Sequence, residues 1–425
     1  MSEKKTAIGL KNFGKRLGPG IITGASDDDP SAIATFVQSG AAFGYGLLWT
    51  MLFSLPLKAV VQEISGRIGR VTGRGLAGNM CFYYSPLFSY PIIGLMVIAN
   101  LINIGADIAA MGSTVKLVAG GSAILYSAIL AFISLLLQAW IPYTKYVSVL
   151  KWLSLFLFSY LAAAFLVDIK WREVLLSTII PVITLDLRFL TSIIGIIGAT
   201  ISPYLFFWQA AQEMEEVNTT ESDLPLKKAP GQAKEQLDRI KIDTYLGMTF
   251  SNLIAFFIMI TSAATLNAAG TTEVRSAAEA AESLKPLAGN FAFVLFSAGI
   301  IGTGLLAIPI LAASAAYSIG EFMKWKVSLE EKPNRAKGFY VVIAVSILLG
   351  FILNLTPANP IKALFWAAVI NGFITVPVIA IMMLISQNRE IMGRFRITSF
   401  LRIIGWLLAG IIFLADLLTL YFLIL

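Results

Sequence analysis

Long apolar stretches separated by short polar segments recur along the whole chain. Because the hydrocarbon core of a bilayer is about 30 Å thick, a helix that crosses it needs about 20 predominantly apolar residues. The pattern predicts eleven membrane-spanning segments, near residues 19–38, 44–66, 90–117, 122–141, 146–167, 188–213, 242–266, 290–321, 338–353, 361–386 and 402–424. The polar stretches 214–241 and 267–287 are expected to be connectors, the second with helical character.

The first predicted span is interrupted by charge and by proline. Asp27, Asp28 and Asp29 lie directly before Pro30 in an otherwise apolar segment of small residues. Since proline has no N–H and its ring clashes with the carbonyl four residues earlier, a helix must break here and free the carbonyl of Ser26. Asp29 is biased towards extended dihedral angles. Carboxylates inside a membrane span are costly, so we interpret the segment as an ion site; the alternative is a polar loop between two short helices.

The sixth predicted span repeats this interruption at Pro203, which frees the carbonyl of Ala199 and disfavours helical angles at Ser202. Spans 1 and 6 would each open one half of a five-plus-five arrangement, and five is odd, so the halves have opposite orientation. Paired broken helices in inverted repeats indicate the midplane site of a transporter. We predict a single transmembrane domain, residues 1–425, with repeats at about 19–167 and 188–386 and an extra span at about 402–424.

Composition and charge support a membrane protein. The chain is 57% hydrophobic and 13% charged, against about 25% charged residues in soluble domains. The single cysteine excludes a disulfide framework within the chain, and no apolar signal-peptide core is found in the basic first 17 residues. With a cytoplasmic N-terminus, 24 basic residues lie in inside segments and 7 in outside segments, as the positive-inside rule requires. We expect a multi-pass cell-membrane protein whose C-terminus is outside.

Several motifs resemble those of the NRAMP family of divalent-metal transporters. They are Gly18-Pro-Gly, Asp29-Pro-Ser-Ala-Ile-Ala-Thr, the run from Gly40 to Trp49, Gln62-Glu-Ile-Ser-Gly-Arg-Ile-Gly with Thr72-Gly-Arg-Gly-Leu, and Gly198-Ala-Thr-Ile-Ser-Pro-Tyr. The resemblance covers spans 1 to 6 by motif and the remainder by topology. It implies an all-α integral membrane protein of the LeuT-type fold, with two inverted five-helix repeats (spans 1–5 and 6–10), an eleventh span, and helices 1 and 6 broken.

The departures from the family pattern concern the metal ligands. The family motif Asp-Pro-Gly-Asn supplies Asp and Asn as ligands; here Asp29 matches the Asp, whereas Ser31 and Ala32 stand at the Gly and Asn positions. The family's span 6 supplies a methionine sulfur, and that position is Ser202. This combination is similar to the subgroup of NRAMP-related magnesium transporters.

Other departures concern the family's proton route. The histidine after the span-6 proline is replaced by Tyr204, and in span 3 the family's Asp matches Asp107 while its nearby Glu falls on Ala110. We therefore expect weak or absent proton coupling.

The available donor atoms favour a hard ion. The chain has no histidine and one cysteine, and neither broken segment contains methionine, whereas transition metals are generally bound by imidazole or sulfur. Magnesium takes oxygen ligands and keeps several waters. We therefore favour a carrier that moves largely hydrated Mg²⁺ by alternating access; the alternative is a proton-coupled importer of Mn²⁺ or another transition metal.

The residues of the expected ion site follow from the two breaks. Asp29 is the expected main ligand and Asp28 the second, directly or through water, and the Ala199 carbonyl and Ser202 hydroxyl complete the shell. Asp107 would hydrogen-bond a bound water or the first-span carboxylates, or make a structural helix contact. No resident cofactor is expected, and the partners are the divalent ion and the lipid bilayer, with no nucleic acid and no obligatory protein partner evident.

A second set of residues is expected farther from the ion. Asp27 would lie in the access path or pair with a neighbour, and Ala32 and Tyr204 would line the access path or second shell. Gln209 and Glu213 would line an inner vestibule or, as we favour, form the solvated end of span 6. Lys58 is expected to be a snorkelling or helix-pairing cation, and Asn371 in span 10 is a weaker candidate.

Three other classes remain open. A sodium-coupled amino-acid carrier would present a half-helix N-terminus to a substrate carboxylate, which three aspartates would repel. An intramembrane aspartyl protease would need two catalytic carboxylates, such as Asp29 and Asp107, but the sequence has no Gly-X-Gly-Asp run. A receptor or channel does not require paired breaks. We expect that the protein is not an enzyme.

Overall fold

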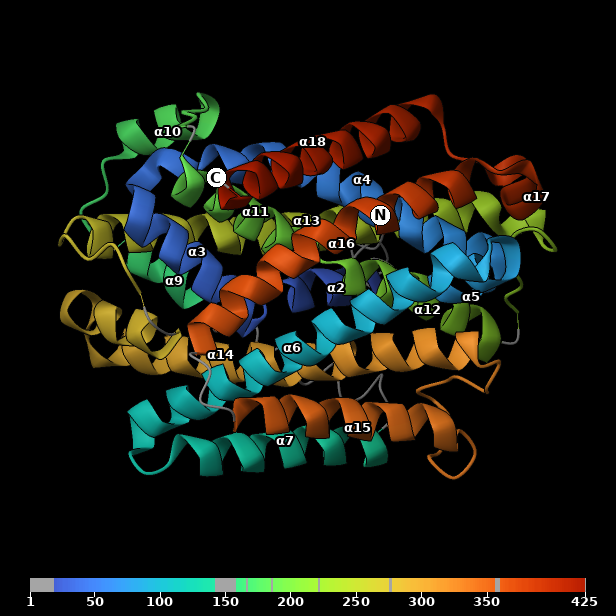
Figure 1. Cartoon of the computed structure of the whole chain (residues 1–425), viewed down its shortest axis with the longest axis horizontal. Coiled ribbons are helices and arrows are strands. Elements are labelled where there is room, and N and C mark those ends of the chain that lie inside the picture. Colours follow the sequence, from blue (N-terminus) through green and yellow to red (C-terminus); the bar gives the residue numbers. More distant parts are fainter. Residues whose placement is uncertain are drawn as a thin grey trace, which may run out of the picture.

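Helices make up nearly all of the computed structural model, which describes residues 19–141, 158–165, 167–184, 186–220, 222–274, 277–355 and 360–424. Most of the long helices run along a common direction (Figure 1). The helices are α2 (Pro19–Asp27), α3 (Pro30–Phe43), α4 (Trp49–Thr72), α5 (Leu76–Tyr83), α6 (Pro86–Ala119), α7 (Ala123–Trp140), α9 (Phe158–Ala164), α10 (Trp171–Ile179), α11 (Leu187–Thr200), α12 (Pro203–Thr219), α13 (Ala233–Ser262), α14 (Ala277–Phe322), α15 (Lys337–Asn354), α16 (Pro360–Gln387), α17 (Arg389–Met392) and α18 (Ser399–Ile424). Short elements join them: the 3₁₀ turns η1 (Gly44–Leu47), η3 (Pro230–Gln232) and η5 (Gly393–Phe395), and a π-helical turn, η4 (Ala263–Asn267).

The predicted spans coincide with helix wherever the structure describes them. Among the described residues, eight helices are long and apolar enough to cross a membrane. Spans 1 and 2 fall outside that set because α2 and α3 are short and α4 carries several charges; α3 and α4 meet at a 107° bend through η1. Residues 146–157, more than half of predicted span 5, lie outside the described residues, as do the basic residues 1–18. The all-α, multi-span class is therefore confirmed.

Both predicted helix breaks are present. α2 ends at Asp27 and α3 begins at Pro30, with Asp29 between them in an extended conformation (φ −67°, ψ 165°). In the sixth span, α11 ends at Thr200 and α12 begins at Pro203, and Ser202 is also extended (φ −78°, ψ 126°). In each span the residue before proline leaves the helical region, as its steric restriction predicts.

The connectors differ partly from expectation. The stretch 214–241, predicted to be a polar loop, continues α12 as far as Thr219 and contains the first turns of α13. The stretch 267–287 has the predicted helical character, because α14 begins at Ala277. Gly289 interrupts α14 with a positive φ of 78°, a conformation that glycine adopts without strain.

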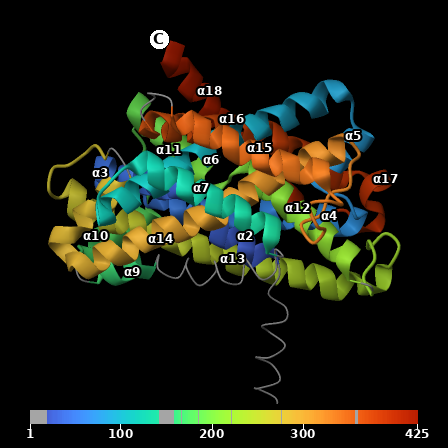
Figure 2. The same ribbon diagram turned by 90° about the horizontal axis from the view of Figure 1, so that it is seen from below.

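The helices form two packed groups that meet at the helix breaks. One group joins α2, α4, α12 and α13, and the other joins α6, α7, α14 and α15. In Figure 1, α7 and α15 lie along the lower edge, α6 and α14 lie above them, and α2 and α12 are central. α3 and α12 contact both α6 and α14, so the breaks lie where the two groups meet. Figure 2 places α18 at the periphery beside α16, with which it packs.

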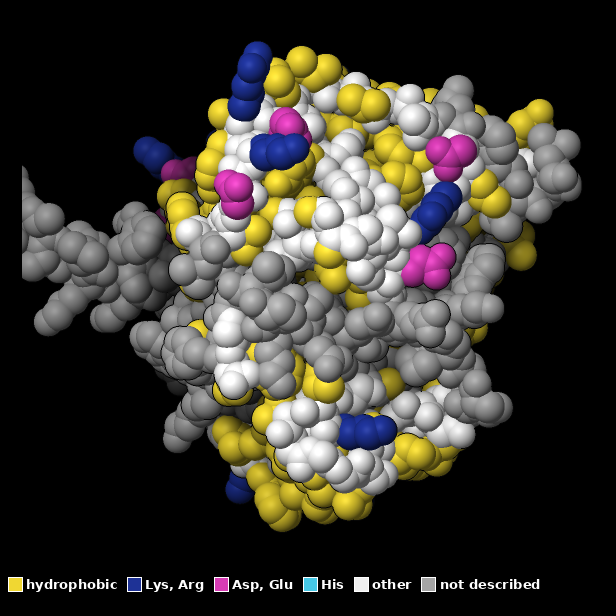
Figure 3. Space-filling model, turned by 90° about the vertical axis from the view of Figure 1, so that its left-hand side faces the viewer, with side chains coloured by type: hydrophobic (Ala, Val, Ile, Leu, Met, Phe, Trp, Pro, Cys, Tyr) yellow, Lys and Arg dark blue, Asp and Glu magenta, His cyan; other side chains and the backbone are white. Residues whose placement is uncertain are grey.

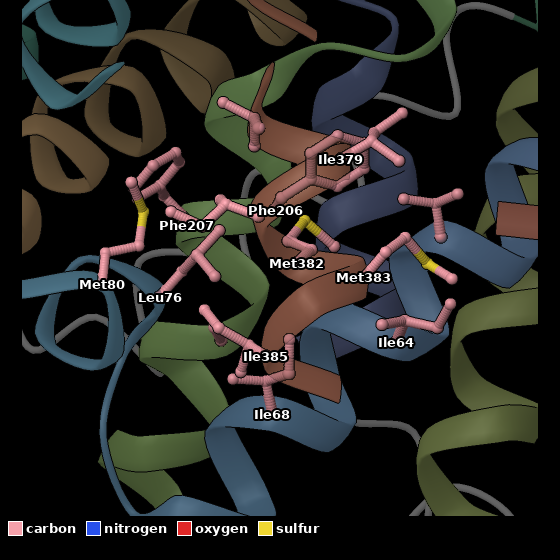
Figure 4. Close-up of a cluster of buried hydrophobic side chains, with 14 of the residues drawn as sticks. Ile64, Ile68, Leu76, Met80, Phe206, Phe207, Ile379, Met382, Met383 and Ile385 are labelled. Carbon is pink, nitrogen blue, oxygen red and sulfur yellow. The ribbon is translucent and has the colours of Figure 1, made fainter. Parts of the chain in front are cut away.

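A hydrophobic cluster holds the second half of span 6 in place (Figure 4). Its side chains come from α4, α5, α12 and α16 and include Ile64, Met80, Phe206, Phe207 and Met382, each at most 2% exposed. Close packing of this kind stabilises helix association in a bilayer through van der Waals contacts, because lipid chains are as apolar as the side chains. The cluster therefore fixes α12, and the break at its start, against α4 and α16.

The outer surface is also apolar, with charge at the ends. Large hydrophobic side chains such as Leu87 (76% exposed) and Trp140 (77%) point outward. Figure 3 looks at the end of the molecule that carries α10 and shows basic and acidic side chains scattered over that end among hydrophobic ones. An apolar belt with charged ends is the arrangement expected of a protein that crosses a bilayer.

α2 packs against α13 at backbone distance through small residues. A Cβ added to Gly24 would lie 2.2 Å from the Gly247 carbonyl oxygen, and one added to Gly20 would lie 2.6 Å from the Thr244 nitrogen. Glycines four residues apart on one face let helix backbones approach closely. The same face is joined by a hydrogen bond of 2.6 Å from the Gly20 N–H to Asp243 Oδ2.

We expect Gly24→Ala to destabilise the protein by about 1–3 kcal/mol, because the methyl group forces α2 away from α13. The measurement is the midpoint of thermal unfolding in detergent. Gly94→Ala in α6 is the matched control, since nothing lies within 4 Å of its added Cβ. Equal midpoints for the two variants would contradict the assigned packing.

Candidate functional site

Asp29 lies at the break of span 1 and caps the second half-helix. Its Oδ1 accepts the Ala32 N–H at 2.7 Å and the Ser31 hydroxyl at 2.6 Å. An aspartate at the N-cap satisfies a backbone donor that the start of a helix leaves unpaired. The side chain is 3% exposed, and its second oxygen, Oδ2, is outside this capping network. Asp29 thus uses one oxygen, Oδ1, to cap α3.

Asp28, in the break itself, and Asp107, on α6, lie beside Asp29. The Ser31 N–H donates to Asp107 Oδ1 on α6 at 3.2 Å, which brings Asp107 to the first turn of α3. The Ser251 hydroxyl of α13 lies 3.4 Å from Asp28 Oδ1. Among the described residues, Asp28 Oδ2 and Asp107 Oδ2 are buried without a hydrogen-bond partner. Burying a charged oxygen without a partner is costly, so a cation between these helices would compensate them.

Asp27 is paired with Lys58. The Lys58 ammonium lies 3.0 Å from Asp27 Oδ2, and the Ser251 hydroxyl donates to the same oxygen at 2.7 Å. Lys58 is only 1% exposed, so it does not snorkel, because snorkelling would place its head group in water. Of the two roles expected for Lys58, helix pairing is the one observed, and of those expected for Asp27, pairing with a neighbour.

The two breaks face each other through a hydrogen bond. The Tyr204 hydroxyl, at the start of α12, donates to the Ser26 carbonyl at 3.0 Å. This is the carbonyl that Pro30 was predicted to free. Tyr204 is buried, and its ring crosses from one broken span to the other. The arrangement brings the acidic break of span 1 next to the carbonyl-rich break of span 6.

The span-6 break offers oxygen atoms. The Ser202 hydroxyl donates to the Gly198 carbonyl at 2.9 Å, which leaves its lone pairs as acceptors. Pro203 has no N–H to give to the Ala199 carbonyl, and Ala199 is 7% exposed. The Ile201 carbonyl accepts the Thr375 hydroxyl of α16 at 3.0 Å. The predicted ligand positions Ala199 and Ser202 therefore lie at a buried break, while the Ile201 carbonyl is occupied.

Gln209 and Glu213 do not form a solvated helix end. Both are fully buried. Gln209 Oε1 accepts the Thr23 hydroxyl of α2 at 2.6 Å, and Glu213 pairs with Arg239 at 2.5 Å. The expectation was wrong because Arg239 of α13 pairs with Glu213 and Thr23 of α2 bonds Gln209. The sequence carried a weak signal for this pair, namely a basic residue within a stretch that we interpreted as loop.

A second basic residue closes the same end. Arg70 of α4 is fully buried and lies 2.5 Å from Asp223 and 4.0 Å from Glu216. Glu216 also lies 3.0 Å from Arg239. These pairs join α4, α12 and α13 at the predicted cytoplasmic end.

Two minor candidates have modest roles. Ala32 is 1% exposed and packs in the core, and its backbone N–H is the group that Asp29 caps. Asn371 is 5% exposed, and its carbonyl accepts the Thr375 hydroxyl at 2.6 Å.

The site is not a cage of protein ligands. Within the described residues, no three carboxylate or thiolate side chains converge closely enough to hold a metal ion. A cation bound here would draw on one or two carboxylates, backbone carbonyls, a hydroxyl and water. Such a set of hard oxygen donors suits Mg²⁺, Ca²⁺ and Mn²⁺.

A separate hollow of about 550 Å³ opens at the far end of α3. It is lined by η1, α10 and the π-helical turn η4, with Tyr45, Asp168, Lys170, Glu173 and Asn267 among its residues. α3 has 14 residues, so the hollow is about 20 Å from Asp29 along the helix axis. It belongs to the predicted outer face and is distinct from the aspartate site.

Comparisons with known proteins agree on one family. The family model "Natural resistance-associated macrophage protein-like" (Nramp) matches residues 20–422. The divalent metal cation transporter MntH of Pectobacterium carotovorum is 26% identical over 409 residues, covering 93% of this chain and 91% of that protein. The protein of the same name from Caldanaerobacter subterraneus is 27% identical over 429 residues, covering 97% and 94%.

Solved structures show the same architecture. The manganese transporter of Eremococcus coleocola superimposes with a TM-score of 0.73 at 18% identity, covering 96% of this chain and 85% of that one. Mhp1, a transporter of the nucleobase-cation-symport-1 family in a closed conformation, superimposes with a TM-score of 0.57 at 14% identity, covering 96% and 92%. The predicted LeuT-type fold is thereby confirmed.

Proposed function

The chain belongs to the Nramp family, and we propose from this that it carries a divalent metal cation across a membrane, using the two facing helix breaks as its ion site. Membership excludes the protease, receptor and amino-acid-carrier alternatives. Full-length relatives of this chain are named divalent metal cation transporters. Their likeness extends over 93% and 97% of this chain, which supports a transport role of the same kind.

The hydrogen bond from Tyr204 to the Ser26 carbonyl is the observation that carries the proposal. It joins the break that bears the aspartates to the break that bears the freed carbonyl of Ala199. Irregular backbone at membrane depth is tolerated only where it is buried in protein or lines a cavity. Two such breaks in contact, in spans that open opposite repeats, are the expected midplane site of an alternating-access carrier.

We propose a distinct role for each donor. Asp29 binds the ion through Oδ2 while Oδ1 keeps α3 capped. Asp28, whose Oδ2 is buried without a partner among the described residues, is the second carboxylate. The Ala199 carbonyl and the Ser202 hydroxyl approach from span 6, and Asp107 orients a water on the ion.

Release towards the predicted cytoplasmic side would require α2 to separate from α12 and α13. The bonds that hold α2 there are those from Thr23 to Gln209 and from Gly20 to Asp243. The Glu213–Arg239 pair closes the same end. We propose that these contacts open together when the ion leaves.

Manganese is the first candidate substrate. The Eremococcus coleocola neighbour is a manganese transporter by name, and oxygen ligands accept Mn²⁺ as well as Mg²⁺. Magnesium is the second candidate, favoured by one observation. Ala32 and Ser202 stand at positions where the family pattern has an amide and a sulfur ligand, so the remaining donors are hard oxygens, as a hydrated Mg²⁺ requires.

Two variants of Asp29 distinguish the contribution of its negative charge to ion binding from the contribution of its helix cap to stability. Asparagine retains the side-chain oxygen that caps a helix, so Asp29→Asn should fold normally but bind Mn²⁺ about a hundredfold more weakly, because a carboxylate within contact of the ion is lost. Asp29→Ala should lose about 1 kcal/mol of stability as well. Binding by calorimetry and thermal unfolding measure the two effects.

Asp186→Asn is the matched control for Asp29→Asn. Asp186 caps α11 by accepting the Phe189 N–H at 2.9 Å, away from the site. It should leave Mn²⁺ affinity unchanged. Wild-type affinity in Asp29→Asn would exclude Asp29 as the main ligand.

The choice of ion depends on position 202. Ser202→Met should raise the preference for Mn²⁺ over Mg²⁺ by about tenfold, because thioether sulfur favours softer ions. Ser202→Leu, of similar size and without sulfur, should not. The measurement is Mn²⁺ uptake into liposomes with and without excess Mg²⁺. If Mn²⁺ uptake by the wild type resists Mg²⁺ and Ser202→Met adds nothing, the magnesium candidate is abandoned.

Proton movement is predicted to be weak. The chain has no histidine, the Tyr204 hydroxyl is committed to Ser26, and Ala110 offers no carboxylate beside Asp107. Liposomes that contain a pH-sensitive dye should show metal uptake without matching acidification, and a protonophore should not alter the uptake rate. Acidification that tracks metal uptake would overturn this prediction.

A further inference from the structure

Lys58 is a buried cation in the middle of a membrane span. Its ammonium lies 3.0 Å from Asp27 Oδ2 and 3.2 Å from the Ser251 hydroxyl, and the residue is 1% exposed. Charged side chains at membrane depth are costly and mark functional positions. The other basic residues of α4, Arg67 and Arg70, lie near its end. Lys58 therefore needs an explanation in terms of the ion site next to it.

The geometry around Lys58 is that of a cation subsite. Its oxygen atoms come from two helices, Asp27 on α2 and Ser251 on α13, and the ammonium reaches in from a third, α4. The Ser251 hydroxyl also lies 3.4 Å from Asp28 Oδ1, so this serine is shared between the subsite and the proposed ligand set. Asp27 Oδ1 is buried without a hydrogen-bond partner among the described residues. The carboxylate is thus held on one oxygen only.

The Lys58–Asp27 pair also compensates one negative charge next to the proposed ion site. Asp27 is two residues from Asp29, and without Lys58 it would add a further uncompensated carboxylate to Asp28, Asp29 and Asp107. Buried like charges repel strongly, and opposite charges within a few ångströms offset them. A lysine in this place supplies one fixed positive charge that cannot diffuse away.

We propose that Lys58 is a resident cation, tethered to α4, that fills a second cation subsite formed by Asp27 and Ser251 and so limits the transporter to one divalent ion. The inference rests on the proposed function. Lys58 acts here as a specificity-determining residue: it does not touch the transported ion, but it removes Asp27 from the set of ligands open to it. A purely structural ion pair would alter stability and leave the number of bound ions unchanged.

The test counts bound ions in the full chain. Purified protein in choline chloride is titrated with MnCl₂, and free Mn²⁺ is measured by electron paramagnetic resonance. Wild type should bind one Mn²⁺ per chain. Lys58→Met, which keeps the length and removes the charge, should bind two, or bind the first about tenfold more tightly because the nearest positive charge is gone. Replacing choline by sodium should weaken the second site if Na⁺ fills the vacated subsite.

Two further variants make the result unambiguous. Asp27→Asn combined with Lys58→Met removes both charges and should return the count to one, and it also serves if Lys58→Met alone does not fold. Lys170→Met removes a lysine from an exposed ion pair with Glu173, at 3.3 Å, and should leave one site of wild-type affinity.

The outcomes separate the inference from the proposed function. If Lys58→Met folds and binds one Mn²⁺ with wild-type affinity, the resident-cation role is wrong. The same holds if the folded double variant loses Mn²⁺ binding, because Asp27 would then be a ligand itself. If wild type binds no Mn²⁺ or Mg²⁺, the proposed function fails first.

Discussion

The structure depends on backbone groups that proline leaves unpaired in a place with little water. Each such group would cost several kcal/mol in the hydrocarbon layer, and the fold provides a partner for several of them. The Ser26 carbonyl accepts the Tyr204 hydroxyl, the Ile201 carbonyl accepts Thr375, and the Ala32 N–H is capped by Asp29. The Ala199 carbonyl, to which Pro203 has no N–H to give, is one of the groups proposed to bind the ion. The two helix breaks and the proposed ion site therefore depend on the same two prolines.

Close helix packing holds the polar groups of the two breaks opposite each other. Gly24 places the α2 backbone directly against Gly247 of α13, and Gly69 of α4 approaches the carbonyl of Ala210 on α12. Because no side chains separate these backbones, the helices cannot move closer together without a clash, and this contact keeps the breaks aligned. The apolar cluster of Figure 4 adds support on the other side of α12. A polar site can thus be held at membrane depth without loops that reach water.

Local rules were sufficient to predict the spans and the breaks, because apolar length and the steric effect of Pro30 and Pro203 act on neighbouring residues. The position of Asp107 near the first break could be inferred only through family resemblance. Long-range pairing was missed: Glu213 and Gln209 were expected at a solvated end, yet Arg239 and Thr23 cover them. Lys58 is an intermediate case. Its position inside a predicted span could be inferred from the sequence, whereas its pairing with Asp27 on α2 depends on tertiary packing.

The single phenolic bond between Tyr204 and Ser26 has a mechanical consequence. It ties the end of one half-helix to the beginning of another, so that tilting either one pulls on its counterpart. We therefore expect the two helix breaks to move together as long as this hydrogen bond is intact, and independently once it is broken. The Tyr204 hydroxyl therefore couples the two half-helices, whereas a phenylalanine of nearly the same shape has no hydroxyl to donate.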